Sequence, residues 1–134
     1  MRKNMKAEIL NTRDQRIRTD IKKLVRRLSR DFPMNRTVIN IVFVNNRKVQ
    51  ELNLKFLKRN RPTDVLAFPL GFTDPDNSAK VLGEVYVSRD QARLQAKQNG
   101  LSYYDEIQHL VLHGCFHLFG FNHQQMPALY AKYL

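Results

Sequence analysis

Three of the four histidines in this chain of 134 residues lie between positions 113 and 123. His113 and His117 are spaced by one helical turn, so on a helix both imidazoles lie on one face and can reach a single metal ion. Gly120 should end that helix, and the turn that follows brings His123 back toward the pair. Three neutral imidazoles on a tetrahedral ion leave one position for water, which is the arrangement of catalytic zinc. These residues predict one zinc site per chain, although another divalent metal would fit the same ligands.

The residues around the histidines restrict the chemistry of this site. Zinc peptidases of the H-E-x-x-H type carry their general-base glutamate directly after the first helical histidine, and that position is Gly114 here. Cys115 falls on the opposite side of the helix and is expected to be a buried structural thiol. His109 lies one turn before His113 but is rotated away from His117, so we expect it to support or pack against the site rather than to bind metal.

Without the peptidase glutamate, proton transfer at the metal requires another group. Asp64 and Glu84 are the candidates, because each lies near the end of a predicted strand that should lead toward the histidine helix. Asp64 could equally cap a loop, and Glu84 could equally be a charge on the surface of its strand. The sequence leaves both roles open.

The hydrophobic pattern indicates the elements that must position these residues. Alternating or β-branched runs predict strands at 5–11, 37–44, 65–68 and 81–88, and apolar residues at helical spacing predict helices at 12–30, after Asn45 or Asn46, at 89–99 and at 102–119. Pro69 should stop the third strand, and Pro127 can start a short final helix. This alternation predicts one α+β domain over residues 1–134. We expect a small mixed sheet of three or four strands covered by helices, with the metal site on the C-terminal helix and the turn after it.

Two further expectations concern the segments on either side of the third strand. The apolar residues of the second helix recur at helical spacing and should face the core; they are Val49, Leu52, Phe56 and Leu57. The segment 71–80 has the composition of an exposed turn.

The chain carries an excess of positive charge at its N-terminal end. The 23 Lys and Arg against 12 Asp and Glu give a net charge of +11, and residues 1–30 hold +8 of it, from eleven basic and three acidic side chains. A basic surface attracts polyanions, nucleic acid above all, because phosphate contacts release condensed counterions. An ordinary solvated surface can have the same composition, so charge alone indicates a class of partner and no chemistry.

The composition also bears on location. No apolar run approaches the ~20 residues that a membrane-spanning helix needs, and the basic start of the chain lacks the apolar core of a signal peptide. The single cysteine cannot form an internal disulfide, so a reducing cytoplasm is the expected location.

Three linked segments of the chain resemble one known family. The stretch 113–123, HGCFHLFGFNH, closely resembles the H-G-x-x-H-L-x-G-[YF]-x-H signature of the YbeY family of metal-dependent endoribonucleases. Residues 52–69, LNLKFLKRNRPTDVLAFP, are similar to its L-N-x-x-[FY]-R-x-x-x-x-P-T-D-V-L-[ST]-F-P block, and residues 82–88, LGEVYVS, to its L-G-[DE]-[IV]-x-[IV]-S strand. The resemblance extends from about residue 38 to residue 123.

The resemblance implies a hydrolase that cuts single-stranded RNA. It implies a role in ribosomal RNA maturation, including processing of the 3′ end of 16S rRNA, and in ribosome quality control. The implied metal ligands are His113, His117 and His123, and the metal is usually taken to be zinc. The implied partners are ribosomal RNA and the ribosomal subunit, with no membrane and no small-molecule cofactor.

The chain departs from the family pattern at two places. The arginine that follows the aromatic residue in the second segment, thought to contact RNA, is Leu57 here. Lys58, Arg59 and Arg61 lie close by and could supply a substitute charge for substrate binding, though not the same geometry. After the third histidine the family continues with an acidic helix, whereas this chain has only QQMPALYAKYL. Either the chain is truncated or this member has a shortened end.

Two other functions remain open from the sequence. The protein could be a non-catalytic RNA- or ribosome-binding protein in which the metal only ties the C-terminal turn to the helix. A fourth protein ligand would favour that hypothesis, whereas an open water position would favour the enzyme. The hypothesis of a metallopeptidase rests on the helical histidine pair. It is weakened because Gly114 stands where a peptidase of this type has its general-base glutamate.

Overall fold

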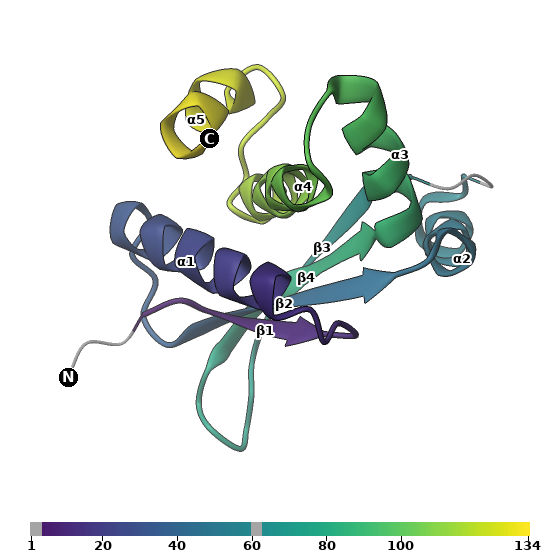
Figure 1. Ribbon diagram of the computed structural model, residues 1–134. Helices are drawn as coiled ribbons and strands as arrows, with labels where there is room; N and C mark the ends of the chain where they lie inside the picture. Colours follow the sequence, from purple (N-terminus) through teal and green to yellow (C-terminus); the bar gives the residue numbers. More distant parts are fainter. Residues whose placement is uncertain (1–3, 60–62) are drawn as a thin grey trace.

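The computed structural model describes residues 4–59 and 63–134, which form an α+β fold with a four-stranded sheet and five helices (Figure 1). This confirms the predicted fold class. The strands are β1 (Lys6–Leu10), β2 (Thr37–Val44), β3 (Val65–Thr73) and β4 (Lys80–Ser88). The helices are α1 (Gln15–Asp31), α2 (Asn46–Leu57), α3 (Arg89–Asn99), α4 (Tyr103–Leu118) and α5 (Met126–Tyr133). Among these helices, none has the length and hydropathy to cross a membrane.

The sheet is mixed, with strand order β1-β2-β4-β3. β1 runs parallel to β2 and β2 parallel to β4, whereas β3 pairs with β4 in the antiparallel direction. β1 and β3 are therefore the two edge strands of the sheet. The β3 edge is the one that approaches the histidine helix, because α4 packs against both β3 and β4.

The central strands are buried on both faces, which explains their β-branched composition. On one face, Ile39, Ile41 and Phe43 of β2 are fully buried in the main core, which also takes in the apolar faces of α1 and α4. On the opposite face, Val42 and Val44 pack with Val49 of α2 in a second, smaller cluster. Successive strand residues point to opposite faces, so α2 covers the face that α1 and α4 leave free.

The predicted starts of α2, α3 and α4 are confirmed by their caps, whereas α1 begins three residues later than predicted, behind the N-cap Asp14. Asn45, and not Asn46, caps α2 by accepting a hydrogen bond from the backbone N–H of Lys48. Ser88 and Ser102 cap α3 and α4 in the same way. Pro127 lies in the first turn of α5, where a missing N–H costs no helical hydrogen bond.

The prediction that Pro69 stops the third strand is wrong. β3 continues to Thr73, so the first part of the segment predicted as an exposed turn, 71–80, is strand. Proline is tolerated because β3 is an edge strand, where one side of the backbone needs no partner. The pairing with β4 shifts register between Pro69 and Phe72, which accommodates the interruption.

The prediction that the last turn of α2 faces the core is also wrong. Phe56 is 54% exposed and Leu57 45% exposed, whereas Val49 is fully buried. The helix leaves the sheet at its C-terminal end, and there the Phe56 ring contacts the edge strand, with its centroid 5.2 Å from that of the Phe68 ring. Helical spacing indicates which residues share a stripe, but not how far the neighbouring sheet extends beneath it.

Two glycines let α4 lie directly on β4. A Cβ added to Gly114 would stand 2.4 Å from Cγ1 of Val85, and one added to Gly83 would stand 2.6 Å from Cδ2 of Leu118. Both distances are far below a van der Waals contact. A side chain at Gly114 would push the helix away from Val85, and a side chain at Gly83 would also meet the carbonyl oxygen of Phe68 on β3 at 2.5 Å. The glutamate of the peptidase pattern could not be housed at position 114 in this fold.

Replacing Gly114 with alanine should therefore destabilise the protein. We expect a net loss of about 1–3 kcal/mol from overpacking, despite the helix-propensity gain of about 0.8–1.0 kcal/mol that alanine brings. Denaturant unfolding of Gly114→Ala measures this. The control is the same substitution in a Val85→Ala background, where the cost should shrink because the clashing methyl groups are gone. An equal cost in both backgrounds would show that Val85 is not the constraint.

Candidate metal centre

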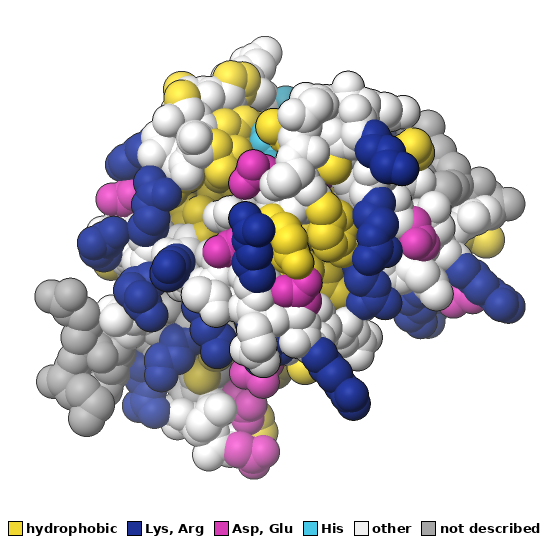
Figure 2. All heavy atoms as spheres, viewed as in Figure 1, with side chains coloured by type: hydrophobic (Ala, Val, Ile, Leu, Met, Phe, Trp, Pro, Cys, Tyr) yellow, Lys and Arg dark blue, Asp and Glu magenta, His cyan; other side chains and the backbone are white. Residues whose placement is uncertain are grey.

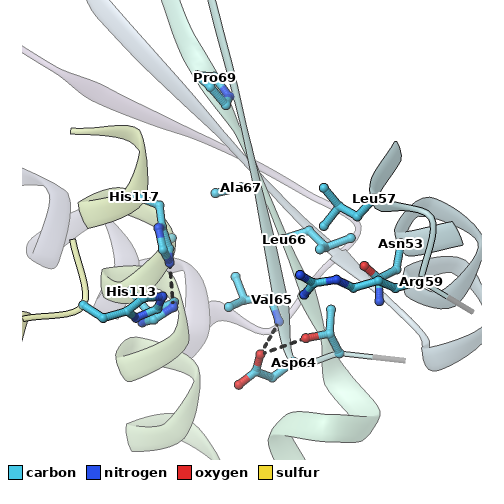
Figure 3. A pocket seen from close by; sticks show the side chains of 13 residues that line it. Asn53, Leu57, Arg59, Asp64, Val65, Leu66, Ala67, Pro69, His113 and His117 are labelled. Carbon is cyan, nitrogen blue, oxygen red and sulfur yellow. Dashed lines mark hydrogen bonds between the residues drawn. The ribbon is translucent and has the colours of Figure 1, made fainter. Parts of the chain in front are cut away.

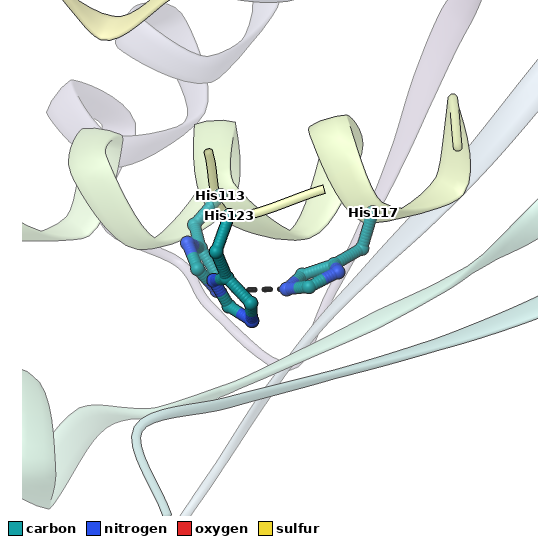
Figure 4. Close-up of side chains that lie close together, drawn as sticks. All are labelled: His113, His117 and His123. Atoms are coloured by element: carbon teal, nitrogen blue, oxygen red, sulfur yellow. Dashed lines mark hydrogen bonds between the residues drawn. The ribbon is translucent and has the colours of Figure 1, made fainter. Parts of the chain in front are cut away.

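The three histidines of the sequence motif come together at the C-terminal end of α4 (Figure 4). One ligand nitrogen from each of His113, His117 and His123 lies within 4.8 Å of the others, and the Nε2 atoms of His113 and His117 are 2.9 Å apart. Two imidazole nitrogens that bind one tetrahedral zinc ion at about 2.0–2.1 Å are about 3.3 Å from each other. This separation lies between the 2.9 Å of the His113–His117 pair and the 4.8 Å limit for the whole group. The three side chains could hold one metal ion.

The backbone after α4 returns His123 to the helix. Gly120 has a φ of +89°, a conformation that L side chains rarely adopt, and its N–H donates to the carbonyl of His117 at 3.1 Å. The N–H of Phe121 donates to the carbonyl of Phe116 at 3.0 Å, and their two rings meet edge to face. Hydrogen bonds and an aromatic contact therefore hold the turn that carries the third histidine.

The surroundings keep the helical histidines neutral. Burial is the main cause that lowers the pKa of His113 to about 4, with His117 adding to the shift and Asp64 opposing it. Burial also lowers the pKa of His117, with His123 as a further cause. At neutral pH both imidazoles therefore carry a free lone pair, which metal binding requires.

No other histidine, cysteine, aspartate or glutamate in residues 4–59 and 63–134 joins the three histidines as a further ligand. His109 lies outside the group and stacks on the ring of Tyr130 with 4.6 Å between ring centroids, in agreement with the expected supporting or packing role. Cys115 is fully buried, as predicted, and burial raises the pKa of its thiol to about 12. It is an unreactive thiol on the far side of the helix.

The histidines form one wall of a pocket of about 650 Å³ (Figure 3). Strand β3 lines it from Val65 to Pro69, and the end of α2 and the following loop form the opposite wall with Leu57 and Arg59. The pocket is thus assembled from three segments that are far apart in the sequence. It is open to solvent.

Of the two carboxylates proposed for proton transfer, Asp64 lies in the pocket and Glu84 does not. Asp64 lines the pocket, and its Oδ1 accepts hydrogen bonds from the N–H of Val65 at 2.8 Å and from the hydroxyl of Thr63 at 3.4 Å. Glu84 lies outside this pocket, and its Oε1 accepts from the hydroxyl of Tyr86 at 3.0 Å. Its strand neighbours Gly83 and Val85 face α4, so Glu84 points to the opposite face of the sheet, away from the histidines.

Asp64 takes part in a polar contact with Gln95 and Glu106 that the sequence did not predict. With its amide nitrogen facing the two carboxylates, Gln95 donates to Oε1 of Glu106 at 3.2 Å and to Oδ2 of Asp64 at 3.3 Å. Glu106 is only 2% exposed and lies on α4 two turns before His113. The only available signal was a glutamate on the apolar stripe of a helix. Gln95 links α3 to both the histidine helix and the pocket.

Of the three basic residues predicted to bind substrate, only Arg59 is placed in the pocket by the described structure. Lys58 ends α2 in the left-handed conformation, with a φ of +59°, and its side chain is exposed. This turn sends the next residue, Arg59, into the pocket, where it lies near Leu57. Arg61 lies outside the described residues.

Comparison with known proteins places the chain in a family. The family model described as Endoribonuclease YbeY matches residues 2–129. The chain belongs to the YbeY family. It is 35% identical over 92 residues to the endoribonuclease YbeY of Aquifex aeolicus, which covers 69% of this chain and 60% of that protein. It is 40% identical over 88 residues to the endoribonuclease YbeY of Carboxydothermus hydrogenoformans, with 66% of this chain and 59% of that protein covered.

The fold of this YbeY family member is also found in a solved structure. A Thermotoga maritima protein determined in solution superposes with a TM-score of 0.59 at 25% sequence identity, over 89% of this chain and 74% of that one. The chain spans about three fifths of the length of the two curated relatives named above.

We expect the protein to bind about one divalent metal per chain, and each of the variants His113→Ala, His117→Ala and His123→Ala to lose most of it, because two imidazoles are too few ligands. The control is His109→Ala, which removes a histidine outside the ligand group and should leave most of the metal bound. Elemental analysis of folded, dialysed protein measures the metal content. Full metal occupancy in the His123→Ala variant would show that His123 is not a metal ligand.

Proposed function

We propose that this protein is a zinc-dependent endoribonuclease that cuts single-stranded RNA in ribosomal RNA maturation, including the 3′ end of 16S rRNA, and in ribosome quality control. The observation that carries the proposal is the three-histidine group on the wall of an open pocket whose opposite wall holds an arginine. Family membership supports the class of substrate. A cytoplasmic location and the ribosomal subunit as partner belong to the same proposal.

The roles of the residues follow from their places in the pocket. A zinc ion held by the three histidines would lower the pKa of a bound water and would stabilise the negative charge that develops on the cleaved phosphodiester. His113 and His117, being neutral, offer their lone pairs without a competing proton. Arg59 faces them across the pocket and can hold an RNA phosphate through charge-assisted hydrogen bonds. Of the two carboxylates, Asp64 is the candidate for proton transfer, because it lines the same pocket.

The geometry disfavours the two other functions. A purely structural metal is normally saturated by four protein ligands, and the described residues offer a group of three. A peptidase of the H-E-x-x-H type needs its glutamate where Gly114 leaves no room for a side chain.

The basic charge supports an RNA partner, though not all of it is free. Figure 2 shows Lys and Arg side chains gathered over α1 and β1. Arg27 donates to the backbone carbonyls of Lys132 and Tyr133, so its charge stabilises the end of α5. Lys22, Lys23 and Arg26 are exposed on the same helix and remain available to phosphates.

Incubating zinc-loaded protein with single-stranded RNA, duplex RNA and an unfolded polypeptide tests the function directly. We expect cleavage of the single-stranded RNA alone, abolished by a chelator and restored by added zinc. The His117→Ala variant controls for a contaminating nuclease. RNA binding without cleavage by the loaded protein would favour the non-catalytic hypothesis, and cleavage of the polypeptide would favour the peptidase.

Arg59 and Leu57 allow a sharper test of substrate binding. Because Arg59 lines the pocket, Arg59→Ala should lower kcat/KM for RNA by roughly 10- to 150-fold, as expected for a charged hydrogen bond of about 1.5–3 kcal/mol. The matched control is Lys58→Ala, which removes an adjacent charge outside the pocket and should change little.

Leu57→Arg should be tolerated, because Leu57 is 45% exposed, and should raise activity less in wild-type protein than in Arg59→Ala. That difference would show that Arg59 already performs the role of the missing family arginine. If Arg59→Ala and Lys58→Ala lowered kcat/KM for RNA equally, the effect would instead come from the total positive charge of the loop and not from the position of Arg59.

A further inference from the structure

The C-terminal helix α5 brings a tyrosine to the metal centre. The hydroxyl of Tyr130 lies within hydrogen-bond distance of Nδ1 of His113, the ring nitrogen that does not face the other histidines. Seventeen residues separate the two in sequence, and no sequence pattern indicated the contact. The ring of Tyr130 is held by stacking on His109 and by a tilted contact with Phe116 at 5.5 Å.

The hydroxyl of Tyr130 has a second hydrogen-bonding partner besides His113. A tyrosine hydroxyl has one proton to donate and can also accept. The sulfur of Met126 lies 3.6 Å away and can take this proton, which leaves the oxygen free to accept a hydrogen bond from Nδ1–H of His113. In that arrangement the imidazole proton is on Nδ1 and the lone pair is on Nε2. Nε2 is the atom that stands 2.9 Å from Nε2 of His117.

The position of α5, and with it the hydroxyl, is set by α1. Arg27 of α1 donates to the carbonyls of Lys132 at 3.0 Å and Tyr133 at 3.1 Å, at the end of α5. Asp31, the last residue of α1, accepts a hydrogen bond from the hydroxyl of Tyr133 and forms an ion pair with Lys132 at 3.3 Å. These contacts attach the short helix to a long one that is itself packed in the core.

We propose that Tyr130 is a positioning residue of the metal centre: its hydroxyl holds His113 in the Nδ1–H tautomer and in the ring orientation that presents Nε2 to the metal. Ligating histidines in metalloproteins commonly donate their second ring N–H to a protein oxygen, and losing that partner weakens metal binding. The proposal rests on the metal dependence of the proposed function. It assigns α5 a role in metal affinity in addition to its packing.

The variant Tyr130→Phe tests the proposal, because it keeps the ring and its stacking on His109 and removes only the hydroxyl. We expect zinc affinity, measured by competition with a chromophoric chelator, to fall by about 10- to 100-fold, and the visible absorption of the cobalt-substituted protein to shift. The matched control is Tyr133→Phe, which removes a hydroxyl from the same helix, the one bonded to Asp31. It should lower the unfolding midpoint but leave metal affinity and the cobalt spectrum nearly unchanged, because Arg27 and the ion pair between Lys132 and Asp31 still hold α5 in place.

A second measurement needs no metal. Long-range ¹H–¹⁵N spectra of the metal-free protein should show His113 as the Nδ1–H tautomer in the wild type and in Tyr133→Phe, and a loss of that preference in Tyr130→Phe. An unchanged tautomer and unchanged zinc affinity in Tyr130→Phe would overturn the proposal. Equal losses of affinity in Tyr130→Phe and Tyr133→Phe would also overturn it, because they would show that anchoring of α5 alone matters. A wild type that shows the tautomer but cleaves no RNA would overturn the proposed function and leave this assignment standing.

Discussion

The direct packing of α4 on β4 is the contact on which the site depends. At Gly114 and Gly83 the helix and the strand approach so closely that only hydrogen fits between backbone and neighbour. Because interiors are close-packed, this contact fixes the height of α4 above the sheet. His113 and His117, on the flank of the same helix, therefore lie beside strand β3 and open onto the pocket. The same constraint excludes a glutamate from the position that a peptidase requires.

The third ligand and its support come from the segment after α4. The left-handed Gly120 reverses the chain, and Phe121 fixes the reversal by packing on Phe116. The chain then enters α5, which α1 holds through Arg27 and Asp31. The basic helix α1 thus contributes some of its charge to the fold and leaves the rest exposed. A net charge read from sequence overstates the number of cations free to meet a polyanion.

Sequence patterns predicted the elements well where local forces decide. The caps at Asn45, Ser88 and Ser102 and the amphipathic α1 depend on residues within a turn or two of one another, and all agree with the structure. The errors arose where a distant partner decides. Pro69 remains in a strand because β3 happens to be an edge, and Phe56 and Leu57 are exposed because the sheet ends beneath α2.

The sequence by itself determined the three-histidine group, because an i, i+4 pair on a helix and a ligand just past a glycine turn are placed by local backbone geometry alone. It also determined the family, through three motifs in order. Only the tertiary structure decided which charged residues meet that group: Arg59 and Asp64 line the same pocket, Glu84 faces away, and Tyr130 approaches from the last helix. These relations depend on strand order, on which face a strand residue occupies, and on contacts between helices far apart in the chain. No local spacing in the sequence encodes them.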